Sequence, residues 1–493
     1  MARGGLGTRL PPPPLRRSRR RAHRPFLESG HRPAVCHRLG RALRRSASLH
    51  YYPLGKYRPL RIRPGPDPLV TASRRSLLRW GLQSVAALPL TRRLSPLLAA
   101  LPEIPLPDLA SFKDRDDEEF WQAVRRCFPL DPQVVYLNNG SLGPTPLPVL
   151  RSLADLTREI ASDPSEKMWG PLGNRLEEVR GKAAALLGVA PDDVALTRNT
   201  TEGISTVGLG LGLTPGDEVI TTDQEHPGGA GVWQFLEGRG VRRVTVPVPL
   251  PPAPWESFLE KLEAALTART RVLALPHLTF GSGHLLPLRE AATLAKQHRL
   301  PLCVDGAHPP GMLPVDLQSL GCATYASSSH KWLLSPPGTG TLFVAAEIRE
   351  RLAPRVFTGT GFTGKTARRY DDFGTRNLAE VLAQGAALDF HRAIGPERAW
   401  RRIQLLTGHL RKGLQSIPRV RILTPLESGR SGGLTTFALK GIPHDRALEL
   451  LGKEAHFVLR AIPELDAIRV STGIYNLPEE LDLLLSAVEG IVA

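Results

Sequence analysis

The sequence predicts an α/β fold built on a mostly parallel sheet, and two observations lead to this prediction. From about residue 130 onward, short apolar runs alternate with amphipathic segments of helical period. Strands separated by helices pair in parallel, because each connection crosses over the sheet. The 493-residue chain is also 41% hydrophobic and 23% charged, which supplies a large core and excludes global disorder. We therefore expect a sheet covered by helices on both faces, followed by a smaller α/β domain.

The net charge of +17 is concentrated near the N-terminus. Residues 1–100 contain 22 of the 64 basic residues and two of the 47 acidic residues, which gives +20, so the other 393 residues carry −3. A slightly acidic body argues against nucleic-acid binding by residues 101–493. A protein that binds nucleic acid through its Arg-rich leader, and is not an enzyme, remains the alternative. The cysteines have no CxxC spacing, so we expect neither a metal site nor a disulfide scaffold. They are Cys36, Cys127, Cys303 and Cys322.

Two segments precede the body. Residues 1–69 are rich in Arg and Pro without hydrophobic periodicity, so we expect a disordered arm, or no arm at all if translation starts near Val70. Residues 70–104 place Arg74 and Arg75 directly before a modest apolar run, which resembles a twin-arginine export signal. The run is too short to anchor the chain in a bilayer. We predict an exported or periplasmic protein; the alternatives are a cytoplasmic location and a mitochondrial-type presequence.

The elements of the body follow in chain order. Strands are expected where short runs are rich in Val, Ile, Leu and Thr, at 134–137, 193–198, 218–223, 242–248, 271–278 and 300–306. Helices are expected where apolar residues recur at helical spacing, at 147–161, 173–188, from 200 onward, 286–298 and 410–417. Gly188 marks the end of the second helix. Strands at 435–440 and 467–472 belong to the smaller domain, which we place at 381–493, after a large domain with its N-terminal segment at 105–380.

The polar residues at the strand ends deserve most weight, because an open parallel sheet binds ligands beyond the carboxyl ends of its strands. Asp305 follows a wholly apolar strand. Lys331 is one of 11 lysines; three serines and a histidine precede it, and the apolar residues WLL follow it. Taken alone, such an aspartate is as readily a turn former, and such a lysine a surface residue. Together, a lysine and an acid at neighbouring strand ends suit pyridoxal phosphate (PLP), which needs a Schiff-base lysine and an acid beside its ring nitrogen.

The remaining parts of a PLP site also have candidates. Thr200 and Thr201 begin a helix, where free N–H groups and the helix dipole attract a phosphate. A plain helix cap is an equally good interpretation of these threonines alone. His226, at another strand end, is a candidate to stack on the ring, and a solvent-exposed loop histidine is the simpler interpretation when it is taken alone.

Seven motifs in a fixed order resemble the class V aminotransferases, a family of PLP-dependent enzymes of fold type I. The likeness is to the branch of isopenicillin N epimerases and cysteine desulfurases, and it runs from about residue 120 to 490. The 26-residue spacing of Asp305 and Lys331 is part of it. The motifs are NNGSLGPTP (138–146), TRNTTEG (197–203), DQEHPGG (223–229), VDGAHPPG (304–311), SSSHKW (327–332), GTRN (374–377) and IRVSTGIYN (468–476).

The resemblance implies a role for each matching residue around the cofactor ring. Lys331 is the Schiff-base lysine and the catalytic residue, and Asp305 faces the pyridine nitrogen. His308 stands where the family has a Gln or His near the phenolic oxygen of PLP. His226 corresponds to the histidine that stacks on the ring.

The resemblance likewise implies the ligands of the phosphate and of the substrate. The phosphate ligands are Thr200, Thr201, Ser328 and His330. Thr375 reaches the phosphate of a neighbouring subunit, which implies a homodimer with shared active sites. Arg469 grips the α-carboxylate of an amino-acid substrate through a bidentate contact, and Asn139 contacts the substrate.

One departure from the family bears on the reaction. Cysteine desulfurases carry a nucleophilic cysteine shortly before the carboxylate-binding arginine, and residues 454–469 contain none, so a desulfurase is not expected. We expect an epimerase-like or aminotransferase reaction at Cα, with a β-eliminating lyase as the alternative. An inactive scaffold is disfavoured because Lys331 and Asp305 are both present. A dinucleotide-binding loop at 207–213 is disfavoured because the G-x-G-x-x-G spacing is missing.

Overall fold

The computed structural model describes residues 106–493, apart from 113–114, 252, 255 and 359–363. The chain divides into two compact units at residues 100 and 101, and only the second unit is described here. The Arg- and Pro-rich arm (1–69) and the export-signal segment (70–104) lie outside the described residues.

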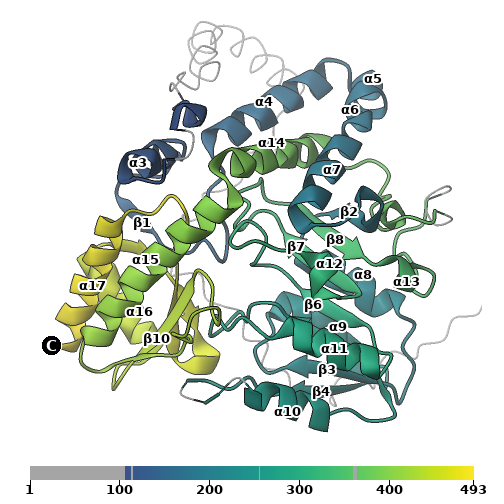
Figure 1. The fold of residues 1–493 in the computed structure, drawn as a ribbon. Coiled ribbons are helices and arrows are strands. Elements are labelled where there is room, and N and C mark those ends of the chain that lie inside the picture. The colour runs from purple at the N-terminus through teal and green to yellow at the C-terminus, as the bar shows by residue number, and fades with distance from the viewer. Residues whose placement is uncertain (1–105, 113–114, 252, 255, 359–363) are drawn as a thin grey trace, which may run out of the picture. The chain divides into compact units, whose positions relative to one another are not determined.

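A seven-stranded sheet forms the centre of the fold (Figure 1). In spatial order its strands are β2 (Val194–Thr197), β8 (Gly340–Val344), β7 (Thr324–Ser328), β6 (Leu302–Asp305), β5 (Thr270–Pro276), β3 (Glu218–Thr222) and β4 (Arg242–Val246). Neighbouring strands pair in parallel except at β8, which is antiparallel to both β7 and β2. The mostly parallel sheet is therefore confirmed. The sequence did not reveal β8, which returns beside β7 without a crossover helix and so runs antiparallel.

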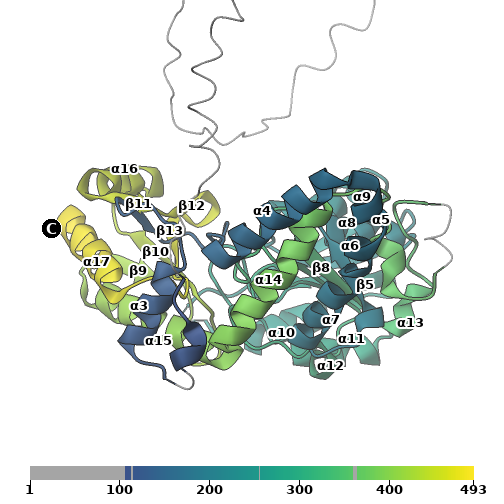
Figure 2. The same ribbon diagram turned by 90° about the horizontal axis from the view of Figure 1, so that it is seen from above.

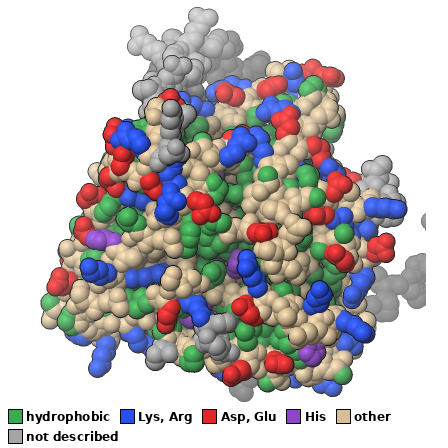
Figure 3. Space-filling model, viewed as in Figure 1, with side chains coloured by type: hydrophobic (Ala, Val, Ile, Leu, Met, Phe, Trp, Pro, Cys, Tyr) green, Lys and Arg blue, Asp and Glu red, His purple; other side chains and the backbone are tan. Residues whose placement is uncertain are grey.

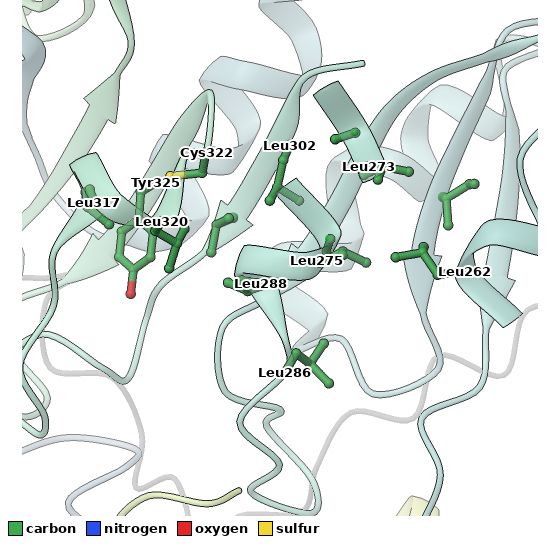
Figure 4. Close-up of a cluster of buried hydrophobic side chains, with 14 of the residues drawn as sticks. Leu262, Leu273, Leu275, Leu286, Leu288, Leu302, Leu317, Leu320, Cys322 and Tyr325 are labelled. Atoms are coloured by element: carbon green, nitrogen blue, oxygen red, sulfur yellow. The ribbon is translucent and has the colours of Figure 1, made fainter. Parts of the chain in front are cut away.

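Helices cover both faces of this sheet because its strands are apolar on both sides. Along β5, Leu273 and Leu275 face one layer, and Val272 and Ala274 face the other. The first layer contains α10 (Glu256–Ala264), α11 (Leu288–Gln297) and α12 (Leu317–Leu320), and Figure 4 shows its leucines, with Tyr325 near Leu317 and Leu320 at one side. The second layer contains α8 (Thr200–Gly210), α9 (Pro227–Glu237) and α13 (Ala346–Arg349).

A further group of helices packs beside β2 at the edge of the sheet. It contains α4 (Leu147–Ser162), α7 (Leu176–Leu187) and α14 (Leu378–Ile394), with the short α5 (Pro164–Trp169) and α6 (Pro171–Asn174) between the first two. The helix expected at 173–188 begins at Leu176 and ends as expected, because Gly188 caps it with a φ of 68° that a residue without a side chain adopts readily.

A second, four-stranded antiparallel sheet forms the C-terminal part. Its order is β12 (Arg460–Ile462), β13 (Ala467–Ser471), β10 (Leu434–Leu439) and β9 (Val420–Ile422). The helices packed on it are α15 (Pro396–Ser416), α16 (His444–Glu454) and α17 (Pro478–Val492).

The N-terminal segment packs on this C-terminal part. Figures 1 and 2 both show α3 (Glu118–Arg126), in blue, beside α15 and α17. Glu118 pairs with the buried Arg402 of α15 at 2.8 Å. The strand expected at 134–137 is present as β1 (Val134–Tyr136), but it pairs with β11 (His456–Val458) and not with the main sheet. The expected domain division at residue 380 falls just inside α14 and stays a prediction.

The surface of the described unit mixes both signs of charge. On the face seen in Figure 3, Lys and Arg alternate with Asp and Glu without a large basic area. Among the helices of residues 106–493 that the structure describes, none has the length and hydrophobicity of a membrane span.

Candidate active site

The carboxyl ends of β2, β3, β6 and β7 lie at the same edge of the main sheet, and the predicted residues follow directly after them. Because β8 is antiparallel to both of its neighbours, β2 and β7 run in the same direction. Thr200 of α8 and Ser328 of β7 therefore meet, with 2.8 Å between their hydroxyl oxygens. The structure thus brings together residues that are 128 positions apart in the sequence.

Lys331 lies at the centre of this edge. Its side chain is buried, and its Nζ is 3.4 Å from Nε2 of His308. Burial lowers the pKa of Lys331 to about 8, and Arg469 and Arg460 lower it as well, while Asp305 acts in the opposite direction. A larger fraction of this lysine than of an exposed one is therefore a neutral amine near neutral pH, the form that attacks an aldehyde or accepts a proton.

Asp305 ends β6 and presents one carboxylate oxygen to the site. Its Oδ1 accepts a hydrogen bond from the backbone N–H of Ala307 at 2.9 Å, which fixes the carboxyl group. A β-carbon on Gly229 would stand 2.8 Å from Oδ2, so the first turn of α9 can approach this oxygen closely only with glycine there. Burial raises the pKa of Asp305, while Lys331 lowers it. A cationic ring nitrogen beside Oδ2 would compensate the cost of burying this charge.

Three of the predicted phosphate ligands, Thr200, Thr201 and Ser328, meet at the N-terminus of α8, and His330 follows Ser328 by two residues. Thr200 receives a second contact there, because its backbone N–H donates to Ser328 Oγ at 3.0 Å. Thr201 is exposed beside Gly228, whose added β-carbon would stand 2.4 Å from the Thr201 hydroxyl oxygen. His330 has a buried Nδ1 without a hydrogen-bond partner in the described part of the chain. A helix N-terminus with hydroxyl groups and an unused imidazole nitrogen fits a phosphate group.

His226 caps the N-terminus of α9 at the end of β3. Its Nδ1 accepts a hydrogen bond from the Gly228 N–H at 3.0 Å, and its ring meets Phe280 edge to face with 4.8 Å between ring centres. Burial, with the charges of Lys331 and Arg469, lowers the pKa of His226 to about 3, so its ring is neutral. A neutral, fixed imidazole is suited to stack on a flat cofactor ring.

Arg469 on β13 reaches the site from the C-terminal part. Its side chain is fully buried; Nη1 donates to the Phe280 carbonyl at 2.9 Å and Nη2 to Ser141 Oγ at 3.2 Å. Its Nε has no partner among the described residues, and neither do the two amide atoms of Asn139, which is 1% exposed. Unpartnered buried donors are costly, so they mark a place for a polar ligand such as a carboxylate.

Four residues of this edge were missed by the sequence interpretation. Phe280 packs beneath both His226 and Arg469, with 5.0 Å from its ring centre to the guanidinium carbon of Arg469. Arg460 is the cross-strand partner of Arg469, and Trp332 donates to His308. Glu225 is a second acid near Asp305, and burial raises its pKa to about 8. Trp332 and Glu225 each had a sequence signal, because Trp332 follows Lys331 and Glu225 precedes His226 within the quoted motifs.

Thr375 is not at this site in the described chain. It is exposed and lines a separate groove with an empty volume of about 1240 Å³, between α6, α7 and the segment 364–378. Trp169, at the end of α5, lines the same groove and is 72% exposed. The expectation that Thr375 serves a neighbouring subunit therefore stays a prediction.

The three cysteines of the described residues are buried and unpaired. Burial raises the pKa of Cys127 to about 11 and that of Cys303 to about 12, and it raises the pKa of Cys322 further. None of them follows residue 453, so the segment before Arg469 contains no cysteine. Across the described ranges, no group of three His, Cys, Asp or Glu side chains is arranged to hold a metal ion.

Known proteins share this sequence pattern. An isopenicillin N epimerase of Streptomyces clavuligerus is 31% identical over 392 residues, covering 75% of this chain and 98% of that protein. A probable cysteine desulfurase of Methanothermobacter thermautotrophicus is 28% identical, covering 75% and 97%.

Solved structures share the fold. A variant of the enzyme C-DES with glycine covalently linked to its PLP cofactor has a TM-score of 0.68 and 25% identity, covering 74% of this chain and 98% of that one. The cysteine desulfurase CsdA of Escherichia coli has a TM-score of 0.66 and 26% identity, covering 75% and 98%.

The family and cofactor follow from these observations together. The sequence model of class V aminotransferases matches residues 135–484. The lysine, the acid, the phosphate cradle and the stacking histidine fit pyridoxal 5′-phosphate, which is the cofactor of this fold type I enzyme. The chain belongs to the aminotransferase class V family of PLP-dependent enzymes.

Proposed function

We propose that this enzyme moves the α-proton of an amino-acid substrate in an epimerase-like reaction. The observation that carries the proposal is the buried amine of Lys331, with its pKa lowered to about 8. Such an amine both anchors the cofactor and, once released, accepts and returns a proton at Cα. PLP, when bound, supplies an electron sink for the charge left on that carbon.

The surroundings of Lys331 provide the means to orient an amino acid. Arg469 and Asn139 together offer unused donors for one carboxylate, within a part of the site that is closed to solvent. Holding the carboxylate fixes the direction of the Cα–H bond relative to Lys331, and this direction decides which bond breaks. The two isopenicillin N epimerases among the relatives, each 31% identical, support the epimerase-like choice over transamination.

A β-eliminating lyase of the same family is the second candidate. One structural neighbour, 25% identical with a TM-score of 0.66, is the cystine C–S lyase C-DES bound to cysteine persulfide. A lyase needs no protein thiol, and this agrees with the absence of cysteine from residues 454–469. The same absence disfavours the persulfide route of a cysteine desulfurase, although several relatives bear that name. The nucleic-acid-binding alternative is not favoured for a member of this family.

One experiment separates these reactions. The PLP-loaded enzyme is incubated in D₂O with a panel of L-amino acids and short peptides, and the products are followed by NMR and chiral chromatography. Deuterium at Cα with appearance of the second stereoisomer is the expected result. A 2-oxo acid formed with consumption of an amino acceptor would indicate transamination, and pyruvate with ammonia or sulfide would indicate elimination. No exchange at Cα with any substrate of the panel would contradict the proposal.

We also propose a homodimer with shared active sites. Trp169 and Thr375 line one groove, and the Trp169 side chain is 72% exposed. A second copy of the chain on this face would bury that surface and bring Thr375 to a neighbouring phosphate site. Light scattering of the purified enzyme is expected to give twice the mass of the chain; a monomer with full activity would contradict the proposal.

We further propose export through a twin-arginine route. Such a route carries folded proteins, and this enzyme must fold around a cofactor made in the cytoplasm. Replacing Arg74 and Arg75 by lysine is expected to leave active enzyme in the cytoplasm, whereas the wild type appears in the periplasm, cut at some point after Leu88. Fractionation that finds uncut wild-type enzyme only in the cytoplasm would contradict export.

A further inference from the structure

Trp332, the residue after the lysine, contacts the active site through a single polar atom. Its indole Nε1–H donates to Nδ1 of His308 at 3.1 Å. The ring is 3% exposed and is surrounded by apolar side chains from both parts of the protein, including Met312 and Ile403. The sequence interpretation assigned no role to Trp332, so this directed contact calls for its own explanation.

The contact determines where His308 carries its proton. An indole N–H is a donor only, so Nδ1 of His308 must be the acceptor. Burial, together with the charges of Lys331 and Arg469, holds the pKa of His308 well below its ordinary value, so the ring is neutral and has one proton. That proton must therefore be on Nε2, which faces Nζ of Lys331 at 3.4 Å.

We propose that Trp332 is a positioning residue that locks His308 in the Nε2–H form, so that His308 donates a hydrogen bond into the site and Lys331 carries the proton at Cα. The expected acceptor is an oxygen of the bound cofactor or substrate, and this part of the inference rests on the proposed function. The tautomer of His308 does not depend on the proposed function, because it follows from contacts within the chain.

The second histidine of the site is fixed in the same way. His226 accepts the Gly228 N–H on its Nδ1 at 3.0 Å, and its ring is also neutral. Its remaining proton is therefore on Nε2 as well. Neither imidazole has an unused lone pair for a substrate proton, which leaves the Lys331 amine to serve as the base.

The position of Trp332 is set by the C-terminal part of the protein. A β-carbon on Gly433, just before β10, would stand 2.4 Å from Cη2 of the indole, so these two residues are in close contact. The Gly433 N–H also contacts the sulfur of Met312 at 3.1 Å. A shift of the C-terminal part would therefore move the indole and weaken its hydrogen bond to His308. The same part of the protein positions both the indole donor of Trp332 and Arg469.

The direct test is the tautomer of His308. The protein is labelled with ¹⁵N at its histidines, His308 is assigned with the His308→Gln variant, and spectra are recorded with and without cofactor. We expect a protonated Nε2 and an unprotonated Nδ1 in the wild type, and exchange between the two tautomers in Trp332→Phe. A wild-type His308 protonated on Nδ1, or on both nitrogens near neutral pH, would overturn the proposal. This readout does not depend on catalysis, so it stands apart from the test of the proposed function.

A double-mutant cycle tests the consequence for the reaction. Trp332→Phe removes only the donor and part of the ring, and we expect a loss of at least about tenfold in kcat, as for other oriented donors. In a His308→Gln background the amide nitrogen always carries its protons, so the same change at Trp332 is expected to cost clearly less. A merely structural role for Trp332 would give equal losses in both backgrounds and would overturn the proposal.

Trp121→Phe is the matched control. Trp121 lies in the same apolar cluster, 2% exposed, and its indole donates to Asp116 at 3.0 Å, away from the site. We expect this variant to lose stability without changing the spectrum of His308. A change in the His308 tautomer in Trp121→Phe would show that general packing, and not the Trp332 donor, sets the tautomer.

Discussion

Replacing Asp305 by asparagine removes one negative charge from the active site and keeps the shape of the side chain. The amide oxygen can still accept the hydrogen bond from Ala307 N–H that holds the carboxylate at 2.9 Å. The changed atom is Oδ2, which lies beside Gly229 and is the oxygen assigned here to the ring nitrogen of the cofactor. The amide at this position presents N–H groups, and these cannot hold a proton on a ring nitrogen.

The size of the effect follows from the lost ion pair. Two unit charges about 4 Å apart attract each other by roughly 4 kcal/mol in a partly screened protein site. About 1.4 kcal/mol corresponds to a factor of ten, so the expected loss in kcat is about 10² to 10³. The variant should still bind PLP, because the lysine and the phosphate cradle are intact.

The assay compares kcat and cofactor content of the wild type and Asp305→Asn. Asp316→Asn is the matched control, because Asp316 caps α12 far from the lysine and asparagine caps a helix equally well. Its kcat is expected to equal that of the wild type. An unchanged kcat in Asp305→Asn, with PLP bound, would mean that Asp305 is only a turn residue and would refute the assignment of the acid.

Three further predictions concern Lys331 and Arg469. Lys331→Ala is expected to abolish turnover and the visible absorbance of covalently held cofactor while circular dichroism stays native; activity near the wild-type rate would exclude this lysine. Because burial lowers the pKa of Lys331 to about 8, its amine becomes neutral as the pH rises through that value, so the rate of cofactor capture by the cofactor-free enzyme is expected to rise between about pH 7 and 9 and then level off. A rate that is flat over this range would contradict the lowered pKa. Arg469→Lys is expected to raise KM for substrates with an α-carboxylate by about tenfold or more, because a point charge replaces a two-pronged contact. An unchanged KM would assign the carboxylate to other residues.

Much of the fold was readable from local sequence patterns. The apolar run before Asp305 and the helical period before Gly188 depend on residues close together in the chain, and both elements formed where they were expected. Two strand pairings could not be predicted from the sequence. β8 lies between β7 and β2, and β1 joins β11 and not the main sheet, because strand partners are chosen by contacts between distant segments.

The active site shows the same division. The sequence by itself determined that a lysine, an acid and a helix N-terminus follow strands of one sheet, since a strand end and a helix start are local features. Only the tertiary structure decided what surrounds them: Phe280 beneath His226, Arg460 opposite Arg469, and the indole of Trp332 against His308. The proton on His308 is the clearest case, because either ring nitrogen of a neutral imidazole can carry it and the sequence does not say which. The indole N–H of Trp332, held 3.1 Å from Nδ1 by packing between two parts of the chain, places the proton on Nε2.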